Sequence, residues 1–467
     1  MTRVPGLAVW SCAVSLAAGS ACAVKQPPAA PESLKAALPP STVVPPAWKG
    51  APAVAGDVAT DWLQSFSDPQ LVTIVGEGLA NNLNLKAAAY RVAVADGIVV
   101  QARSLLYPQL FVVGGVGAVG RDDTKDRSGI AGQLSWELDL WGRVRAQTAA
   151  AAASRAATDA DLAYARQSLA ATVATLWYHT IATERLRQTA ENASGVYGEL
   201  LRLVQVRNNI GLVSQEDVAL AGADLNRARQ RERAFATSEQ QLSRGLEIVI
   251  GRYPSNELAL APDLPATPAP VPDGLPSDLL TRRPDLIAAE RRMAAAFHGI
   301  QAAEALRWPQ IALTASGGRS TSELLRLAGV PAGFWTVGAQ MLAPLFTGHA
   351  IQAEIGVANA EQQAALMLYG QTALRAFSEV ESTLGSEQLL ADQQRYLEAV
   401  LAQDTEALRL GRLRYDAGAT DLLHVLQLQA RQLDTQFDLI GIRNDRLANR
   451  VALHLALGGG FVPTASP

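Results

Sequence analysis

The sequence predicts a mainly helical protein with a small membrane β-barrel and an internal two-fold repeat. Three observations lead to this fold class: a duplicated segment, long stretches without proline, and two pairs of short alternating segments. Asn84 to Leu110 aligns without a gap with Asp285 to Ile311, and both copies have the same Pro-Gln pair near their ends. Two occurrences are too few for a solenoid, so they indicate pseudo-symmetry within one body, which is common in channels and transporters.

Composition and motifs argue against a soluble enzyme. The 467 residues have a net charge of -4 and only 18% charged residues, which gives no electrostatic reason to expect a nucleic-acid partner. The chain has no P-loop, no HExxH and no G-x-S-x-G, and its five histidines show no ligand spacing. We therefore expect no catalysis, no cofactor and no metal. The G-x-G-x-x-G match at Gly115 to Gly120 precedes a charged loop instead of a helix, which indicates strand glycines.

The N-terminus is predicted to be a secretory signal over residues 1–22. Arg3 precedes an apolar stretch and then small residues, which is the layout of a signal peptide. Gly19-Ser20-Ala21-Cys22 resembles a lipobox, so we expect Cys22 to carry a covalent lipid such as palmitate, although Gly19 stands where Leu is usual. Ordinary cleavage at Ala21-Cys22-Ala23, or retention as a membrane anchor, are the alternatives. Both cysteines lie in this stretch, so the body of the chain has no disulfide.

Proline clusters divide the rest of the chain. Proline and alanine dominate the segment after the signal, a composition that favours an extended strap, and a second cluster separates the repeats. The predicted parts are a strap at 23–57, a first repeat at 58–253, a crossover at 254–276, a second repeat at 277–457 and a C-terminal tail at 458–467.

Long helices are predicted between the proline clusters. Arg143 to Ser194 contains neither proline nor glycine, and a helix of that length would span roughly 75 to 80 Å. Such helices must pack side by side. The second repeat contains an apolar seam with alternating steps of three and four residues, typical of a coiled coil: Leu423, Leu426, Ala430, Leu433, Phe437 and Ile440. The same stepping begins in the first repeat at Val218, Ala221, Leu225 and Ala228.

Each repeat also contains two short strand signals, at about 109–120 and 130–141, and at about 311–320 and 335–346. Ile130 to Trp141 alternates apolar with polar residues, as in a barrel wall between lipid and water. A bilayer does not tolerate an open sheet edge, and closed outer-membrane barrels begin at about eight strands. Four strands per chain therefore require further copies of the chain to close the barrel.

The chain resembles the TolC-like outer-membrane efflux family, and within it the NodT-type lipoproteins of RND tripartite pumps. The matching stretches cover residues 58–457 in order: TDWLQSFSDPQL, SWELDLWGRVRA, GLPSDLLTRRPDLIAAE, APLFTGHAIQAEI and LRYDAGATDLLHVLQLQARQL. The resemblance implies a lipid-anchored homotrimer in the outer membrane of a Gram-negative bacterium. Its twelve-stranded barrel would continue into a periplasmic helical tunnel, which docks onto a periplasmic adaptor and an inner-membrane RND transporter. The implied function is export of small molecules from the cell envelope.

Two glycine turns join the helices of each repeat. We expect glycine to supply the left-handed conformation and Ser214 or Asp421 to cap the next helix. The resemblance implies that the turns dock the adaptor through Arg207, Gly211, Leu212, Ser214, Gly418, Ala419 and Thr420. It also implies a resting periplasmic gate near the second turn, with candidates Arg414, Tyr415, Asp416, Asp421 and His424.

One departure from the family pattern lies after the second turn. His424 and Gln427 stand where the family typically has an aspartate, so a constriction without an acidic ring, or one sensitive to pH, is an alternative. His424 would otherwise be a packing residue between helices.

Two other functions compete with this interpretation. A channel for a type I protein secretion system would have the same fold. A periplasmic adaptor or scaffold lipoprotein would also contain helical hairpins, but only one hairpin between small β-domains. The duplication and the alternation at Ile130 to Trp141 favour the channel.

Overall fold

The computed structural model describes residues 24–50, 61–119, 125–272, 274–322 and 332–460. Cys22, the signal segment and the end of the predicted tail lie outside these residues. The chain divides into two units: 1–41, 90–161 and 285–372 form the first, and 42–89, 162–284 and 373–467 form the second. Helices α4 (Leu83–Ser104), α5 (Arg143–Asn209) and α9 (Ala350–Asp416) contribute to both.

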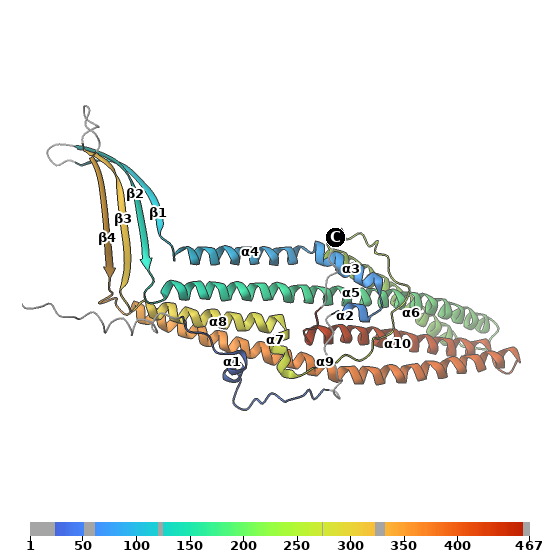
Figure 1. The fold of residues 1–467 in the computed structure, drawn as a ribbon. Coiled ribbons are helices and arrows are strands. Elements are labelled where there is room, and N and C mark those ends of the chain that lie inside the picture. The colour runs from blue at the N-terminus through green and yellow to red at the C-terminus, as the bar shows by residue number, and fades with distance from the viewer. Residues whose placement is uncertain (1–23, 51–60, 120–124, 273, 323–331, 461–467) are drawn as a thin grey trace, which may run out of the picture. The chain divides into compact units, whose positions relative to one another are not determined.

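The first unit contains a four-stranded antiparallel sheet in the order β1-β2-β3-β4 (Figure 1). Its strands are β1 (Gln109–Val119), β2 (Lys125–Leu138), β3 (Gln310–Ser322) and β4 (Ala332–Leu342). Consecutive strands pair along their whole length, whereas β1 and β4 are edge strands with one unpaired side. The four predicted strands are confirmed, but the predicted ends of β2 and β4 are wrong.

The chain leaves the sheet earlier than predicted at both strand ends. β2 stops at Leu138 instead of Trp141 because the Asp139 carboxylate accepts hydrogen bonds from the N–H groups of Val144 (3.0 Å) and Arg145 (2.9 Å), at the start of α5. β4 stops at Leu342 instead of Phe346, since Pro344 has no N–H to give to a ladder.

The sheet has one polar and one apolar face. Gln133 lies opposite Ser316, which lies opposite Thr336, and these cross-strand partners share a face. The other face contains apolar side chains of all four strands, including Leu110, Leu134, Leu313, Val337 and Met341. The predicted alternation is therefore present in the sheet.

Helices pack beside each other in the rest of the first unit. Helix α8 (Pro284–Ala305) places Ala303 against Ile355 and Ala358 of α9. The short α1 (Ala30–Ala37) lies on α9, where the Tyr369 hydroxyl donates to the Ala30 carbonyl. The backbone of Lys25 exchanges two hydrogen bonds, of 3.0 and 3.1 Å, with the side-chain amide of Gln301. The strap thus lies along the helices.

The second unit is built on two helical hairpins. The first joins α5 to α6 (Gln215–Val249), and the second joins α9 to α10 (Leu422–Ala456). Their predicted seam is confirmed, since Leu426, Ala430, Leu433 and Phe437 form one core cluster with four residues of α5. The smaller helices are α2 (Trp62–Ser65), α3 (Pro69–Asn81) and α7 (Leu279–Arg282), with a 3₁₀ turn at Pro276–Asp278.

A second core surrounds Trp62 and Trp177. The Trp177 indole donates to the Asp68 carboxylate, and the Trp62 ring stacks on His454 with 5.5 Å between ring centroids. Arg450 is buried beside this core and is neutralised by Glu387, with a further bond to the Pro268 carbonyl. The predicted proline crossover is therefore tied to α10 by a buried arginine.

Candidate functional site

The first hairpin turn has the predicted helix-ending geometry. Gly211 has a φ of +76°, and the N–H of Leu212 donates to the Arg207 carbonyl at 2.9 Å. The next helix begins with a capping box: Ser214 Oγ accepts from the Asp217 N–H, and the Asp217 carboxylate accepts from the Ser214 N–H. Glycine is needed here because an L side chain is disfavoured at positive φ.

The second turn repeats this arrangement. Gly418 has a φ of +68°, and the N–H of Ala419 donates to the Arg414 carbonyl at 2.8 Å. The Asp421 carboxylate caps α10 by accepting from the His424 N–H at 2.9 Å. The structural role predicted for the two glycines and the two caps is therefore confirmed.

An ion pair joins the two turns. The Arg207 guanidinium lies 2.9 Å from the Asp421 carboxylate. The N–H of His424 and the guanidinium of Arg207 hold the pKa of Asp421 below its usual range, so the carboxylate stays charged well into acidic pH. Sequence reasoning assigned Arg207 to docking and Asp421 to the gate, and it missed that they form one contact. The equal offset of the two turns was the signal that relates them.

The other predicted side chains lie open around this contact. Arg414, Tyr415, Asp416 and His424 have exposed side chains in the single chain. Leu212 is 71% exposed, although it sits beside a rigid turn, and exposed apolar groups of this kind are typical of a docking surface. The tip thus combines a fixed backbone with free apolar and charged side chains.

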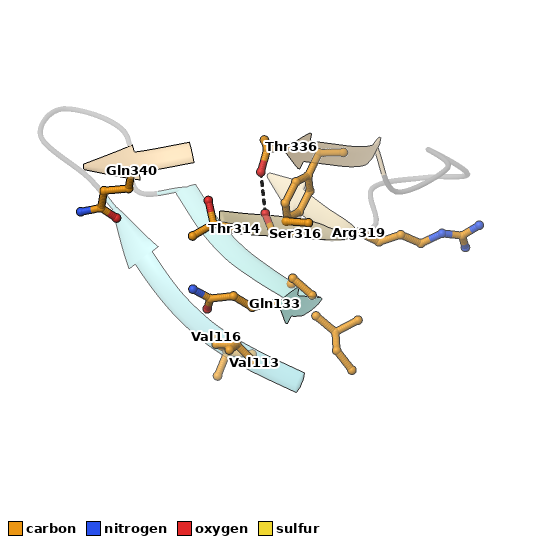
Figure 2. Close-up of a pocket in the computed structure, with 14 residues that line it drawn as sticks. Val113, Val116, Gln133, Thr314, Ser316, Arg319, Thr336 and Gln340 are labelled. Atoms are coloured by element: carbon orange, nitrogen blue, oxygen red, sulfur yellow. Dashed lines mark hydrogen bonds between the residues drawn. The ribbon is translucent and has the colours of Figure 1, made fainter. Parts of the chain in front are cut away.

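The polar face of the sheet lines a hollow of about 790 Å³ (Figure 2). Figure 2 shows Gln133, Thr314, Ser316, Thr336 and Gln340 around it, and the Ser316 and Thr336 hydroxyls are 2.7 Å apart. These uncharged groups can hydrogen-bond to water without holding one ligand tightly. The hollow therefore suits a wetted wall better than a selective pocket.

Aromatic residues lie where the strands meet the helices, a feature that sequence reasoning missed. Trp141 stacks on Trp308 with ring centroids 5.2 Å apart, and its indole donates to the Pro309 carbonyl at 2.7 Å. Tyr107 and Phe346 flank the other two strands at the same end of the sheet, and Phe346 is 88% exposed. Aromatic girdles of this kind mark the edges of the apolar band of outer-membrane barrels.

Two searches of the described residues found no further kind of site. None of the helices in these residues is both long enough and apolar enough to span a bilayer. No group of three or more His, Cys, Asp or Glu side chains in the same residues could hold a metal ion.

Comparison with known proteins assigns this architecture to a family. The model of the family described as outer membrane efflux protein matches residues 74–252 and 275–459, one match for each repeat. The chain belongs to the outer membrane efflux protein family.

Named relatives and solved structures cover most of the chain. It is 30% identical over 451 residues to the pyoverdine export outer membrane protein OpmQ of Pseudomonas aeruginosa, covering 92% of this chain and 94% of OpmQ. It is 29% identical over 425 residues to the probable efflux pump outer membrane protein TtgC of Pseudomonas putida, covering 88% of each. The outer-membrane channel OprN has the same fold, with a TM-score of 0.80 at 24% identity over 91% of this chain and 99% of OprN. The open MtrE channel of Neisseria gonorrhoeae gives a TM-score of 0.81 at 26% identity over 91% and 97%.

Proposed function

We propose that this protein is the outer-membrane channel of a tripartite RND-type efflux pump and conducts small molecules out of the cell envelope. The observation that carries the proposal is the four-stranded sheet, with one apolar face, one polar hollowed face and two unpaired edges. Such a sheet is stable in a bilayer only when its edges are closed. The chain supplies a conduit, and the energy for transport comes from the pump.

The closed form that we propose is a homotrimer with twelve strands. In it β4 of one copy pairs with β1 of the next, as β2 pairs with β3 inside the chain. The internal repeat predicts the register: Ser135 lies opposite Thr314 within the chain, and their counterparts in the other repeats are Leu342 and Val113. Leu342 and Val113 are both more than half exposed in the single chain, as expected of residues awaiting a partner.

Lipid contacts follow from the same sheet. Its apolar face would meet the acyl chains, and the Trp141–Trp308 pair would lie at the periplasmic edge of the bilayer. A lipid on Cys22 fits this placement, because Lys25 is held at Gln301 on α8 and three residues reach at most about 10 Å. The lipid anchor is therefore part of the proposal.

The hairpin tips are proposed to dock the periplasmic adaptor, with Arg207 and Asp421 belonging to the resting gate. Rigid glycine turns with exposed Leu212 and Ala419 provide the docking surface. The named relatives carry different substrates in their names, pyoverdine in one case and toluene in another, although they share this fold. A conduit whose selectivity lies in its pump accounts for that spread better than a selective channel or a protein secretion channel.

An efflux assay tests the proposal. Cells that contain the native adaptor and pump but lack this chain should accumulate a pump-exported dye, and the wild-type chain should restore export. Gly211→Val and Gly418→Val, which place a β-branched residue at positive φ on the docking surface, should reach the outer membrane but not restore export. Gly222→Ala, with open space beside its Cα on α6, is the matched control and should restore it. Normal export without the chain would refute the function.

A further inference from the structure

The two repeats match element by element, so contacts inside the chain can be compared with those expected between copies. Helices α5 and α9 both have 67 residues, and α6 and α10 both have 35. Arg143 and Ala350 start the long helices, and Gln215 and Leu422 start the short ones, 207 residues apart in each case. In the homotrimer of the proposed function, on which this inference rests, the contact of α5 with α10 has a counterpart between α9 of one copy and α6 of the next.

The seam inside the chain, between α5 and α10, is apolar. Its buried residues are Ala190, Ala193, Val196 and Leu200 on α5, and Leu426, Ala430, Leu433 and Phe437 on α10. Phe437 also stacks on Phe235 of α6, and the Arg231 guanidinium lies 3.8 Å from the centre of the Phe437 ring. Large side chains and an aromatic stack therefore hold the two repeats of one chain together.

The counterpart seam between copies lacks these groups. On α6 the positions of Leu426, Ala430, Leu433 and Phe437 are taken by Ala219, Ala223, Asn226 and Gln230. On α9 the positions of the four α5 residues are taken by Leu397, Val400, Gln403 and Ala407. Asn226 and Gln230 are exposed in the single chain. Replacing Leu and Phe by amides removes most of the apolar area that would hold this seam closed.

The turns show the same asymmetry. Arg207 pairs with Asp421 at 2.9 Å inside the chain, and the counterparts of these residues are Arg414 and Ser214. Ser214 is uncharged and already bonded to Asp217 through its N–H and its hydroxyl. The carboxylate nearest to this position, Asp217, shares one oxygen between those two bonds. The seam between copies therefore has no equivalent of the Arg207–Asp421 ion pair.

We propose that the tunnel opens by parting the three seams between copies, α9 against α6 of the next copy, while the α5–α10 seam inside each chain stays closed. Each chain then moves as one body with its two hairpins locked together. The small and amide side chains along the parting seam leave little apolar surface to expose to water when it opens.

Cysteine bridges at the turns test the proposal, because the body of the chain contains no cysteine of its own. Arg414→Cys with Ser214→Cys bridges neighbouring copies, and Arg207→Cys with Asp421→Cys bridges the two turns of one chain. Each purified full-length protein is studied in planar bilayers with a short, reducible bis-thiol linker, before and after reduction. We expect the bridge between copies to lower the frequency of open events about tenfold relative to its reduced form. The bridge within the chain should leave that frequency unchanged within about twofold.

The remaining outcomes separate this proposal from the one beneath it. Equal loss of open events from both bridges, or loss from the bridge within the chain alone, would overturn the assignment of the parting seam. If Arg414→Cys with Ser214→Cys gives no bridged trimer on a denaturing gel although a bridge through the sheet does, the homotrimer stands and the seam assignment fails. If neither pair bridges copies, the homotrimer itself is wrong.

Discussion

At the scale of single residues, a few buried or paired charges decide how the tips and the core respond to change. Asp421 has two tasks, since it caps α10 and pairs with Arg207. Arg450 and His454 are both buried within one turn of α10, and only the arginine is neutralised by a carboxylate. Substitutions at these positions separate structural from gating roles.

Removing the charge of Asp421 should loosen the resting gate with little effect on folding. Asp421→Asn keeps a capping oxygen but loses the ion pair, so open events in planar bilayers should become more frequent. The free energy of unfolding should change by less than about 1 kcal/mol, because the pair is half exposed. Asp421→Ala should cost roughly 1 kcal/mol more through the lost cap. Asp434→Asn, at an exposed pair with Arg231, is the control for charge alone. Unchanged gating in Asp421→Asn would remove this pair from the gate.

Acid should destabilise the second unit through His454. Burial, and secondly the charge of Arg450, lower the pKa of this imidazole from 6.5 to about 4. The unfolded chain therefore binds a proton at pH values where the folded chain does not, so stability falls as the pH drops from 6.5 towards 4. The loss should approach about 3 kcal/mol. His454→Phe, which preserves the stack on Trp62, should flatten the dependence of the thermal midpoint on pH over this interval, whereas His424→Phe at the exposed tip should not.

At the scale of elements, the strap and the strands show how far periodicity predicts structure. The seam of α10 and the four strands were predictable because spacing of three and four, or of two, reports directly on buried faces. The ends of β2 and β4 were not predictable from alternation, since Asp139 and Pro344 end the ladder through caps and a missing N–H. The short helix α1 lies in a proline-rich segment that composition predicted to be extended.

The seat of α1 on α9 depends on Gly370. A Cβ at Gly370 would lie 2.9 Å from the Cβ of Ala37 and 3.0 Å from its carbonyl oxygen. Gly370→Ala should therefore lift α1 and speed tryptic cleavage at Lys35 several-fold. Gly356→Ala, in the same helix with open space beside it, should leave the cleavage rate unchanged and favour the helix by about 1 kcal/mol. Equal cleavage of both variants would mean that α1 is not held at this glycine.

At the scale of the whole molecule, the duplication was the strongest signal in the sequence, and the structure extends it. Helix bounds repeat with one offset, and the family model matches once per repeat. What the sequence alone did not reveal is which contacts are shared by both repeats and which occur once, such as the Arg207–Asp421 pair. Contacts of that kind depend on side chains about 200 residues apart, beyond the reach of local periodicity.

The central claim is that several copies close one sheet through β4 and β1, and a cross-link tests it most directly. Leu342→Cys with Val113→Cys should form disulfides between copies in native outer membranes and give a covalent trimer on a non-reducing denaturing gel. Met341→Cys with Val113→Cys places the two thiols on opposite faces and should stay monomeric. A monomer from the first pair, or trimers from both, would contradict the shared barrel and its register.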